Sequence, residues 1–592
     1  MDRSFLKWSG VATGFTFLCQ LWLFRPITRD YFPTGDELAL EVASTPIGGH
    51  LDPTGWFRQG FHFYFRSYSE WQSSSTDFWR PLANSLFWLN YQLFGANWGN
   101  QLVIGYATHA LMVGLTGFVA YYSFRLSRWL TATAMTISAF NPAFWSHNDS
   151  LDSFSHNTIP ELIQYPAYQT EILCALLMMA ACLAFIKRRY VLFCLVTTVA
   201  LLLKETALTL PIAAMVMIGG WWKTDPVRTA RNFIWLVLPL LLWSLARVAI
   251  FDYGNSIYVL SSATAWGSLL KPIRNLLYLP TLLYRGPLRE TKDALLAHHI
   301  RLIALHGFQF AVNAAWWLAL IYAARRAYDG TRKNWRVAPP EPWVCGLIFA
   351  LGNLFFVMVL QSPEPRFTYF WFALGPAAIF AALSGHRYGV VAAVTIALGL
   401  VVPQFWSIAR SLSAGSIQSY QLSKRSAKEL TTLLGHLPPT VRTVYVVDDF
   451  VLHGTAPEYL AKFAGFHGEL IAVNSIEPVS GCKAMPPASS RYTLTRSVAG
   501  TVLDYSAPAC FYQINEAPLQ LFHGKEVTRG KWMTYRFPEM TTPASSSIGP
   551  EYDPGRRWSA IVSNPSCTSV GACIWVGLDL ASQSYYVLNE SL

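Results

Sequence analysis

The sequence predicts a polytopic α-helical membrane protein that carries a folded C-terminal domain outside the membrane. Mean hydropathy is +0.28, and only 13% of the residues are charged, about half the charged fraction of a soluble domain. Aromatic residues make up 15% of the chain, as expected where the ends of many spans carry Trp and Tyr. Apolar stretches near the ~20 residues that cross a bilayer recur between residues 8 and 407.

We expect about 11 transmembrane helices from these stretches. They cover residues 8–25, 101–123, 129–146, 168–186, 190–204, 206–222, 232–251, 306–324, 342–361, 368–385 and 389–407. The first stretch is too long for a removed signal peptide and lacks its small-residue cleavage site, so we interpret it as a retained helix. The spans and their loops form a predicted first domain, residues 1–410, whose first loop is 26–100.

Basic residues fall between alternate spans, which orients the chain by the positive-inside rule. They are Arg3, Lys7, Arg125, Arg128, Lys187, Arg188, Arg189, Lys223, Arg228, Arg231, the cluster 325–336 and Arg387. The N-terminus is then cytoplasmic, and the long outer loops carry most of the unusual polar residues. The formal net charge of +11 fits this rule and contact with anionic membrane lipid. Short basic clusters between spans do not favour nucleic-acid binding.

Residues 411–592 form a predicted second domain, which lies on the outer side. Residues 421–437 are typical of a helix ended by Pro438, residues 441–447 of a buried strand, and residues 457–464 of a helix. After Cys482 the pattern changes to short alternating strands separated by Gly, Pro and Ser. Examples of these strands are 491–495, 532–537 and 573–578. We therefore expect an α/β layer followed by a β-rich layer.

Four of the nine cysteines lie in this second domain, and the other five lie inside spans as small apolar residues. An even number on the oxidising side of a membrane favours disulfides. We predict the pairs Cys482–Cys510 and Cys567–Cys573, although spacing does not determine connectivity. The chain has no CxxC motif, which argues against zinc, and no metal ligand is assigned.

The acidic segment 30–37 directly follows the first span. Carboxylates beside a membrane-spanning segment are costly, so an acidic pair there indicates a functional site. Asp36 and Glu37, placed after the turn-forming Pro33 and Gly35, are the candidate catalytic residues. A helix cap or a loop anion is the alternative for Asp36, and a solvated neighbour is the alternative for Glu37.

Three further polar features fall on the same predicted face. They are 78–82, which precedes an amphipathic stretch at 84–94, then 201–205 with Pro211 beyond it, and 363–369. A reaction that uses one carboxylate as base and two cations to hold an anion requires about this set of groups.

Together these features resemble the GT-C class of integral membrane glycosyltransferases, over roughly residues 1–410. The resemblance is in particular to the protein O-mannosyltransferase-like and the bacterial polyprenyl-phosphate-sugar-dependent branches. The matching residues are Asp36, Glu37, Arg80, Pro81, Leu82, Tyr91, Phe94, Gly95, Lys204, Glu205, Pro211, Glu364, Arg366 and Tyr369. The late turn reads E-P-R-F where the family has E-R-Y, and the loop 147–167 lacks the HPxxxE segment of one branch. The classes of donor sugar and acceptor therefore stay open.

The resemblance implies an inverting transfer from a polyprenyl-phosphate sugar to a hydroxyl on an envelope glycan, lipid or protein. Asp36 would be the general base, and Glu37 would position the acceptor or hold a divalent cation. The donor phosphate would be bound by Arg366, Lys204 and Arg80, and substrate contacts would come from Glu205, Tyr369 and Trp79. The expected location is a bacterial inner membrane with the C-terminal domain in the periplasm.

Several alternatives stand beside these assignments. Arg80 is equally typical of an interfacial anchor, and Lys204 of a lysine that snorkels from the end of a span. His147, Asp149, Asp152 and His156 have no known metal-ligand spacing and favour a solvated loop, and the pair Asp448-Asp449 favours a turn. At the level of function, a lipid-carrier transporter or flippase and a non-catalytic envelope assembly protein remain alternatives. A transporter would show paired broken helices and an internal repeat, which the sequence lacks.

Overall fold

The structure of the chain is a computed structural model of residues 1–592. It describes residues 3–33, 80–95, 97–145, 169–219, 226–250, 300–334, 340–359, 365–411, 414–447, 460–461, 464–472, 476–478, 491–497, 500–506, 511–514, 517–518, 526–529, 533–536, 557–562, 572–579 and 584–588. The chain divides into two compact units. One contains Met1–Arg29 and Phe78–Ile417, and the other contains Asp30–Asp77 and Gln418–Leu592. The domain boundary that the sequence predicts near residue 410 stays a prediction.

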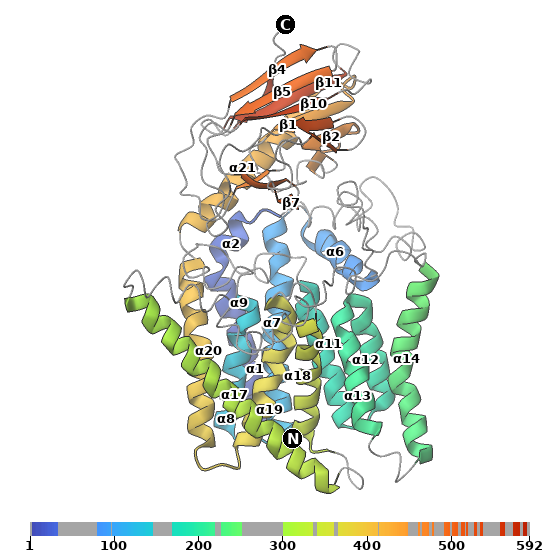
Figure 1. Cartoon of the computed structure of the whole chain (residues 1–592), viewed down its shortest axis with the longest axis vertical. Helices are drawn as coiled ribbons and strands as arrows, with labels where there is room; N and C mark the ends of the chain where they lie inside the picture. The colour runs from blue at the N-terminus through green and yellow to red at the C-terminus, as the bar shows by residue number, and fades with distance from the viewer. Residues whose placement is uncertain are drawn as a thin grey trace. The chain divides into compact units, whose positions relative to one another are not determined.

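The first unit is built from helices, and the colours of Figure 1 give their order along the chain. They are α1 (Arg3–Leu23), α2 (Arg25–Asp30), α6 (Pro81–Phe94), α7 (Trp98–Phe118), η1 (Val119–Ser123), α8 (Arg128–Ala139), α9 (Pro142–Trp145), α11 (Gln169–Ile186), α12 (Tyr190–Leu203), η4 (Glu205–Leu208), α13 (Thr209–Gly219), α14 (Pro226–Ile250), α17 (Ile300–Asn334), α18 (Pro342–Val359), η5 (Pro365–Thr368), α19 (Tyr369–Leu383) and α20 (Gly389–Ser411).

Within the described ranges, three helical segments are long and apolar enough to cross a membrane: Trp98–Ser123, Gln169–Ile186 and Thr229–Ala246. Shorter apolar helices include Tyr190–Leu203 and Tyr369–Leu383. A helical fold with several membrane-spanning segments therefore agrees with the sequence, and the count of about 11 spans stays a prediction.

Two predicted spans differ from the helices that form. The span expected over 129–146 is divided into α8 and α9, because Asn141 and Pro142 end the first helix and start the second. The span expected over 306–324 is part of the longer helix α17, which has 35 residues and continues into the polar sequence after Ala323.

Helix α19 is the centre of the first unit, and every one of its residues is buried. Because it is apolar all round, it is stable only where other helices surround it. Helices α7, α8, α11, α17, α18 and α20 contact it. Trp371 of α19 packs edge-on against Trp316 of α17, with 6.1 Å between the ring centroids. This buried helix fixes the position of its first residue, Tyr369.

Glycines let several of these helices approach closely, as is typical of helices packed in membranes. A Cβ atom on Gly99 of α7 would overlap the backbone carbonyl of Thr28 in α2. A Cβ atom on Gly346 of α18 would likewise overlap the ring of Phe124, which follows η1. Backbone atoms such as the Thr28 carbonyl cannot rotate away, so Gly99 is the stricter of the two positions.

Two basic residues that the sequence assigns to the cytoplasmic side contact the ends of neighbouring helices. Arg128 at the start of α8 donates a hydrogen bond to Ser4 of α1 at 3.2 Å. Arg326 of α17 donates to the carbonyl of Ala382 at the end of α19 and lies 5.8 Å from the ring of Trp343. The first contact joins the start of α8 to the start of α1, and the second joins α17 to the end of α19. Their side of the membrane stays a prediction.

The second unit combines a helix with short strands. Helix α21 (Ala414–Gly435) ends shortly before Pro438, as expected. The strands are β1 (Thr443–Val447), β2 (Glu469–Ala472), β3 (Ile476–Pro478), β4 (Arg491–Ser497), β5 (Gly500–Ser506), β6 (Phe511–Ile514), β7 (Ala517–Pro518), β8 (Glu526–Arg529), β9 (Met533–Arg536), β10 (Arg557–Val562), β11 (Cys573–Asp579) and β12 (Ser584–Leu588).

These strands form three sheets, with the orders β12-β11-β1-β2, β4-β5-β10-β9-β8 and β3-β6-β7. The sequence placed the strand after Cys573 in the β-rich layer, and this is wrong. That strand, β11, returns to pair in parallel with β1, and Tyr445 stacks on Trp575 with 4.7 Å between ring centroids. Its buried residues Trp575, Val576 and Leu578 suit a strand covered on both faces. Cys573 is disulfide-bonded, and the predicted pairings involve cysteines outside the described residues.

We expect Gly99→Ala to destabilise the protein, because the added methyl group meets the Thr28 carbonyl. Overpacking of this kind costs about 1–3 kcal/mol, which thermal unfolding in detergent would report as a lower midpoint. Gly14→Ala in α1 is the matched control, since no atom lies within 4 Å of its added Cβ. An equal midpoint for the two variants would contradict the close approach of α2 and α7.

Candidate functional site

A half-buried ion pair joins the start of α6 to the turn between α12 and α13. The guanidinium of Arg80 donates from Nη2 to Oε2 of Glu205 at 2.7 Å, and its Nε lies 3.0 Å from the same oxygen. The two side chains are 15% and 16% exposed. Pro81 occupies the first turn of α6, where no backbone N–H is needed, so Arg80 is held at the helix start. Residues 125 positions apart are thereby fixed together.

A second, more deeply buried pair joins Lys204 to Glu171 at the start of α11. Their side chains are only 8% and 3% exposed. Lys204 has an extended backbone at the end of α12, which turns its side chain away from that of Glu205. Adjacent residues therefore serve different partners, as the sequence spacing requires. The Lys204 ammonium also lies 4.8 Å from the ring centroid of Phe367 in η5, a cation–π contact.

Further polar contacts hold the turn at residues 204–209 in place. Cys174 of α11 lies 3.6 Å from the Thr206 hydroxyl, and the Thr209 hydroxyl donates to the Thr206 carbonyl at 3.0 Å. Gln169 bridges further elements, because its amide donates to the Gln101 carbonyl at 2.7 Å and accepts from Asn90 at 3.2 Å. Helices α6, α7 and α11 and the turn are thus linked around the two ion pairs.

The charges of this cluster cancel, because Arg80 and Lys204 each face one carboxylate. Burial by itself raises the pKa of Glu205, but the charge and hydrogen bonds of Arg80 outweigh it and hold the pKa below its usual range. Glu205 is therefore ionised at neutral pH and is a weak proton acceptor. A carboxylate in this state is suited to holding Arg80 in place, and less suited to general-base catalysis.

Tyr369 lies at the start of α19 and is 1% exposed. Its hydroxyl is 2.5 Å from Nδ1 of His109, whose Nε2 lies 3.1 Å from the Ala139 carbonyl. Because a carbonyl only accepts, Nε2 carries the proton and Nδ1 accepts from Tyr369. The Tyr369 carbonyl in turn accepts from Asn141 at 3.0 Å, and Phe144 stacks on His109 with 3.9 Å between ring centroids. These contacts make Tyr369 an anchor for η5, and its hydroxyl is already engaged.

Of the residues predicted for the site, Arg80, Lys204, Glu205 and Tyr369 are described with their side chains. Arg366 lies in η5, one residue before Phe367, and only its backbone is described. Asp36, Glu37 and Trp79 lie outside the described residues, as do the clusters at 147–156 and 448–449. Within the second unit, Asp30 of the acidic segment accepts a hydrogen bond from Gln421 of α21 at 2.8 Å.

Lys204 is buried and Arg80 is half-buried, and each is paired with a carboxylate. Their roles in the site stay predictions. Glu171 is the residue that sequence analysis missed. Its signal is a single carboxylate in the first turn of the otherwise apolar stretch 169–186. A buried carboxylate there requires a cationic partner, which the turn at Lys204 supplies. The described residues contain no group of three or more His, Cys, Asp and Glu side chains arranged for a metal.

Comparison with known proteins gives little further information. No family model matches the chain, and no curated protein matches it. One solved structure that aligns with it is ArnT from Cupriavidus metallidurans bound to undecaprenyl phosphate. The two chains are 11% identical with a TM-score of 0.41, over 80% of this chain and 87% of that chain. A similarity this low assigns neither an activity nor site residues to this chain.

Removing the carboxylate of the buried pair should destabilise the first unit strongly. Glu171→Gln leaves the Lys204 ammonium buried opposite a neutral amide, which costs about 3–5 kcal/mol. The free energy of unfolding in mixed detergent micelles measures this loss. The matched control is Asp329→Asn, which breaks an exposed pair with Arg325 at 3.9 Å and should change stability by about 0.5 kcal/mol or less. Similar small effects in both variants would show that Glu171 and Lys204 are not paired in the protein.

Proposed function

We propose that the chain is a membrane glycosyltransferase that moves a sugar from a polyprenyl-phosphate donor to an acceptor hydroxyl on the outer face of the membrane. The observation that carries the proposal is that Arg80 contacts the Lys204-Glu205 turn through an ion pair, and that Phe367 of η5 contacts it through a cation–π interaction. These are three of the four features whose pattern resembles the GT-C class. We propose that the fourth feature, the acidic pair Asp36 and Glu37, lies opposite these three.

The donor phosphate is assigned to Arg366 and Lys204. Lys204 reaches the start of α19 by its contact with Phe367, the neighbour of Arg366 in sequence. A guanidinium offers a planar fork to phosphate oxygens, and an ammonium offers a point charge. Glu171 keeps the ammonium ionised and in place before the donor binds. We assign Arg80 and Glu205 to positioning the site, together with Tyr369.

The reaction then needs one base and no strong acid. The acceptor oxygen attacks the anomeric carbon while the bond from that carbon to the phosphate oxygen breaks, and the electron pair leaves with the phosphate. Asp36 takes the hydroxyl proton, and the cations stabilise the developing phosphate charge. Attack opposite the leaving group inverts the anomeric centre. Glu37 positions the acceptor or holds a divalent cation, and Trp79 contacts the sugar.

The proposed setting is a bacterial inner membrane with the N-terminus in the cytoplasm. The second unit then lies in the periplasm, where its disulfide-bonded Cys573 would be maintained by the oxidising environment. The acceptor is a hydroxyl on an envelope glycan, a lipid or a protein.

Asp36→Asn should abolish most transfer while leaving the protein folded and inserted in the membrane. Loss of a general base lowers the rate by about 10²- to 10⁴-fold. The measurement is turnover of a radiolabelled polyprenyl-phosphate sugar by purified enzyme, with Asp329→Asn as a control that removes an exposed carboxylate. Transfer at the normal rate by Asp36→Asn would remove Asp36 as the base.

Arg366→Ala should weaken use of the donor more than use of the acceptor, because the guanidinium is assigned to the leaving phosphate. Steady-state kinetics with each substrate varied in turn separates the two effects, and kcat/KM for the donor should fall about tenfold or more. Arg366→Lys should recover part of this loss by restoring the charge without the planar fork. The assignment fails if only saturation by the acceptor changes.

A further inference from the structure

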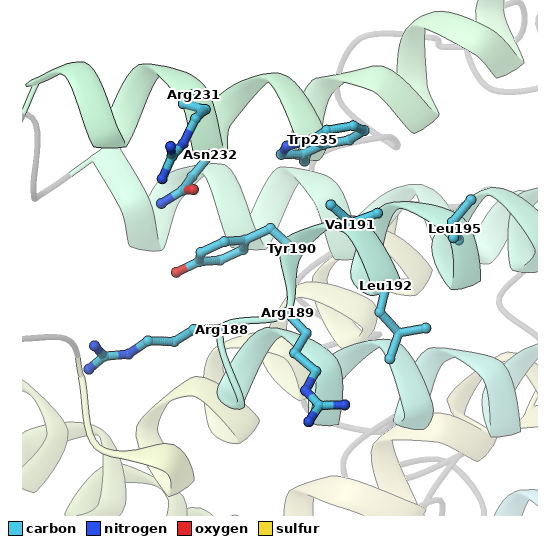
Figure 2. Close-up of a pocket in the computed structure, with 9 residues that line it drawn as sticks. All are labelled: Arg188, Arg189, Tyr190, Val191, Leu192, Leu195, Arg231, Asn232 and Trp235. Atoms are coloured by element: carbon cyan, nitrogen blue, oxygen red, sulfur yellow. The ribbon is translucent and has the colours of Figure 1, made fainter.

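A basic pocket lies where the turn between α11 and α12 meets the first part of α14. Its volume is about 580 Å³, and Arg188, Arg189 and Arg231 are among the residues that line it. Figure 2 shows Arg231 and Asn232 extending from α14 toward the Tyr190 ring, while Arg188 extends to the same side from the turn. Arg189 is directed the other way, beside Leu192. The pocket is at the opposite end of α12 from Lys204, ~20 Å away along the helix axis.

The positive charge of this pocket is uncompensated within the described ranges. None of its lining residues is acidic, and no carboxylate among the described residues pairs with Arg188, Arg189 or Arg231. Each of the three side chains is exposed. Arg188 also has a positive φ of 58° in the turn, a conformation that usually favours glycine. An anion bound between Arg188 and Arg231 would offset the repulsion between their charges.

The rest of the pocket is apolar and continues along the helix. Val191 and Leu195 on α12 are 49% and 60% exposed, and Val199, one turn further, is 41% exposed. These residues follow each other at a spacing of four, so they form one stripe that leads away from the arginines. Tyr190 and Trp235 lie at the junction, where interfacial aromatic residues are typically found. A soluble anion would use the arginines alone, but a lipid would use both parts.

We infer that this pocket binds the headgroup of an anionic glycerophospholipid, with the phosphate between Arg188 and Arg231 and the acyl chains along the apolar stripe of α12. Arg189 lines the rim and faces neighbouring anionic headgroups. Basic pockets between membrane helices on the cytoplasmic side are suited to such lipids. The lipid is distinct from the proposed sugar donor, which belongs to the opposite end of α12, and it would fasten α14 to α11 and α12.

The test uses the purified full-length protein and phosphatidylglycerol as the probe. Wild type should keep phosphatidylglycerol in native mass spectrometry and unfold at a higher temperature with it than with phosphatidylcholine. Arg188→Gln/Arg189→Gln/Arg231→Gln should lower apparent affinity about a hundredfold, given the gain per arginine near an anionic surface. The matched control, Arg3→Gln/Lys7→Gln/Arg325→Gln, removes the same charge from exposed positions outside the pocket and should bind within about twofold of wild type.

The single variant Arg231→Glu tests the same site if the triple variant fails to fold, and it should also lose selectivity for the anionic lipid. Leu195→Asn should weaken lipid binding through the stripe while leaving the arginines intact. Equal loss in the pocket and control variants would mean binding to surface charge alone and would overturn the assignment. Equal stabilisation by phosphatidylcholine, or by glycerol phosphate without acyl chains, would overturn it as well.

Discussion

The pairing of two cations with two carboxylates is the constraint on which the polar end of the first unit depends. Lys204 and Glu171 are almost completely enclosed, and Arg80 and Glu205 are half-buried. A buried charge without its partner is strongly destabilising, so each pair fixes the position of the chain segment that supplies it. The start of α6, the start of α11 and the turn after α12 are held in this way. The contact of Lys204 with Phe367 extends the arrangement to η5.

The two ion pairs also make the cluster neutral overall and hold its charges in fixed orientations. Tyr369 adds a second support, since its hydroxyl and carbonyl are both bonded within the buried network of His109 and Asn141. The backbone next to Arg366 is therefore anchored from the side of α19. Catalysis that depends on positioned charges benefits from such rigidity.

Sequence reasoning predicted the helical membrane class because apolar runs and basic turns are local properties of the chain. It assigned Lys204 to the donor phosphate and Glu205 to the substrate, but it did not predict the side chains with which they pair. Glu171 was missed because its partner is 33 positions away in sequence and no local pattern marks it. The return of β11 to β1 was missed for the same reason, since a parallel pairing joins strands far apart in the chain. The break at Asn141 was readable from Pro142, but the apolar residues on both sides concealed it.

The most direct measurement is an experimental structure of the full-length protein with bound polyprenyl phosphate. We predict that a phosphate oxygen lies at hydrogen-bonding distance, about 3 Å, from the Lys204 ammonium and the Arg366 guanidinium. We also predict that the Asp36 carboxylate faces the same bound phosphate. A phosphate bound at the Arg188 end of α12, or one remote from Lys204 and Arg366, would contradict the proposed transfer site.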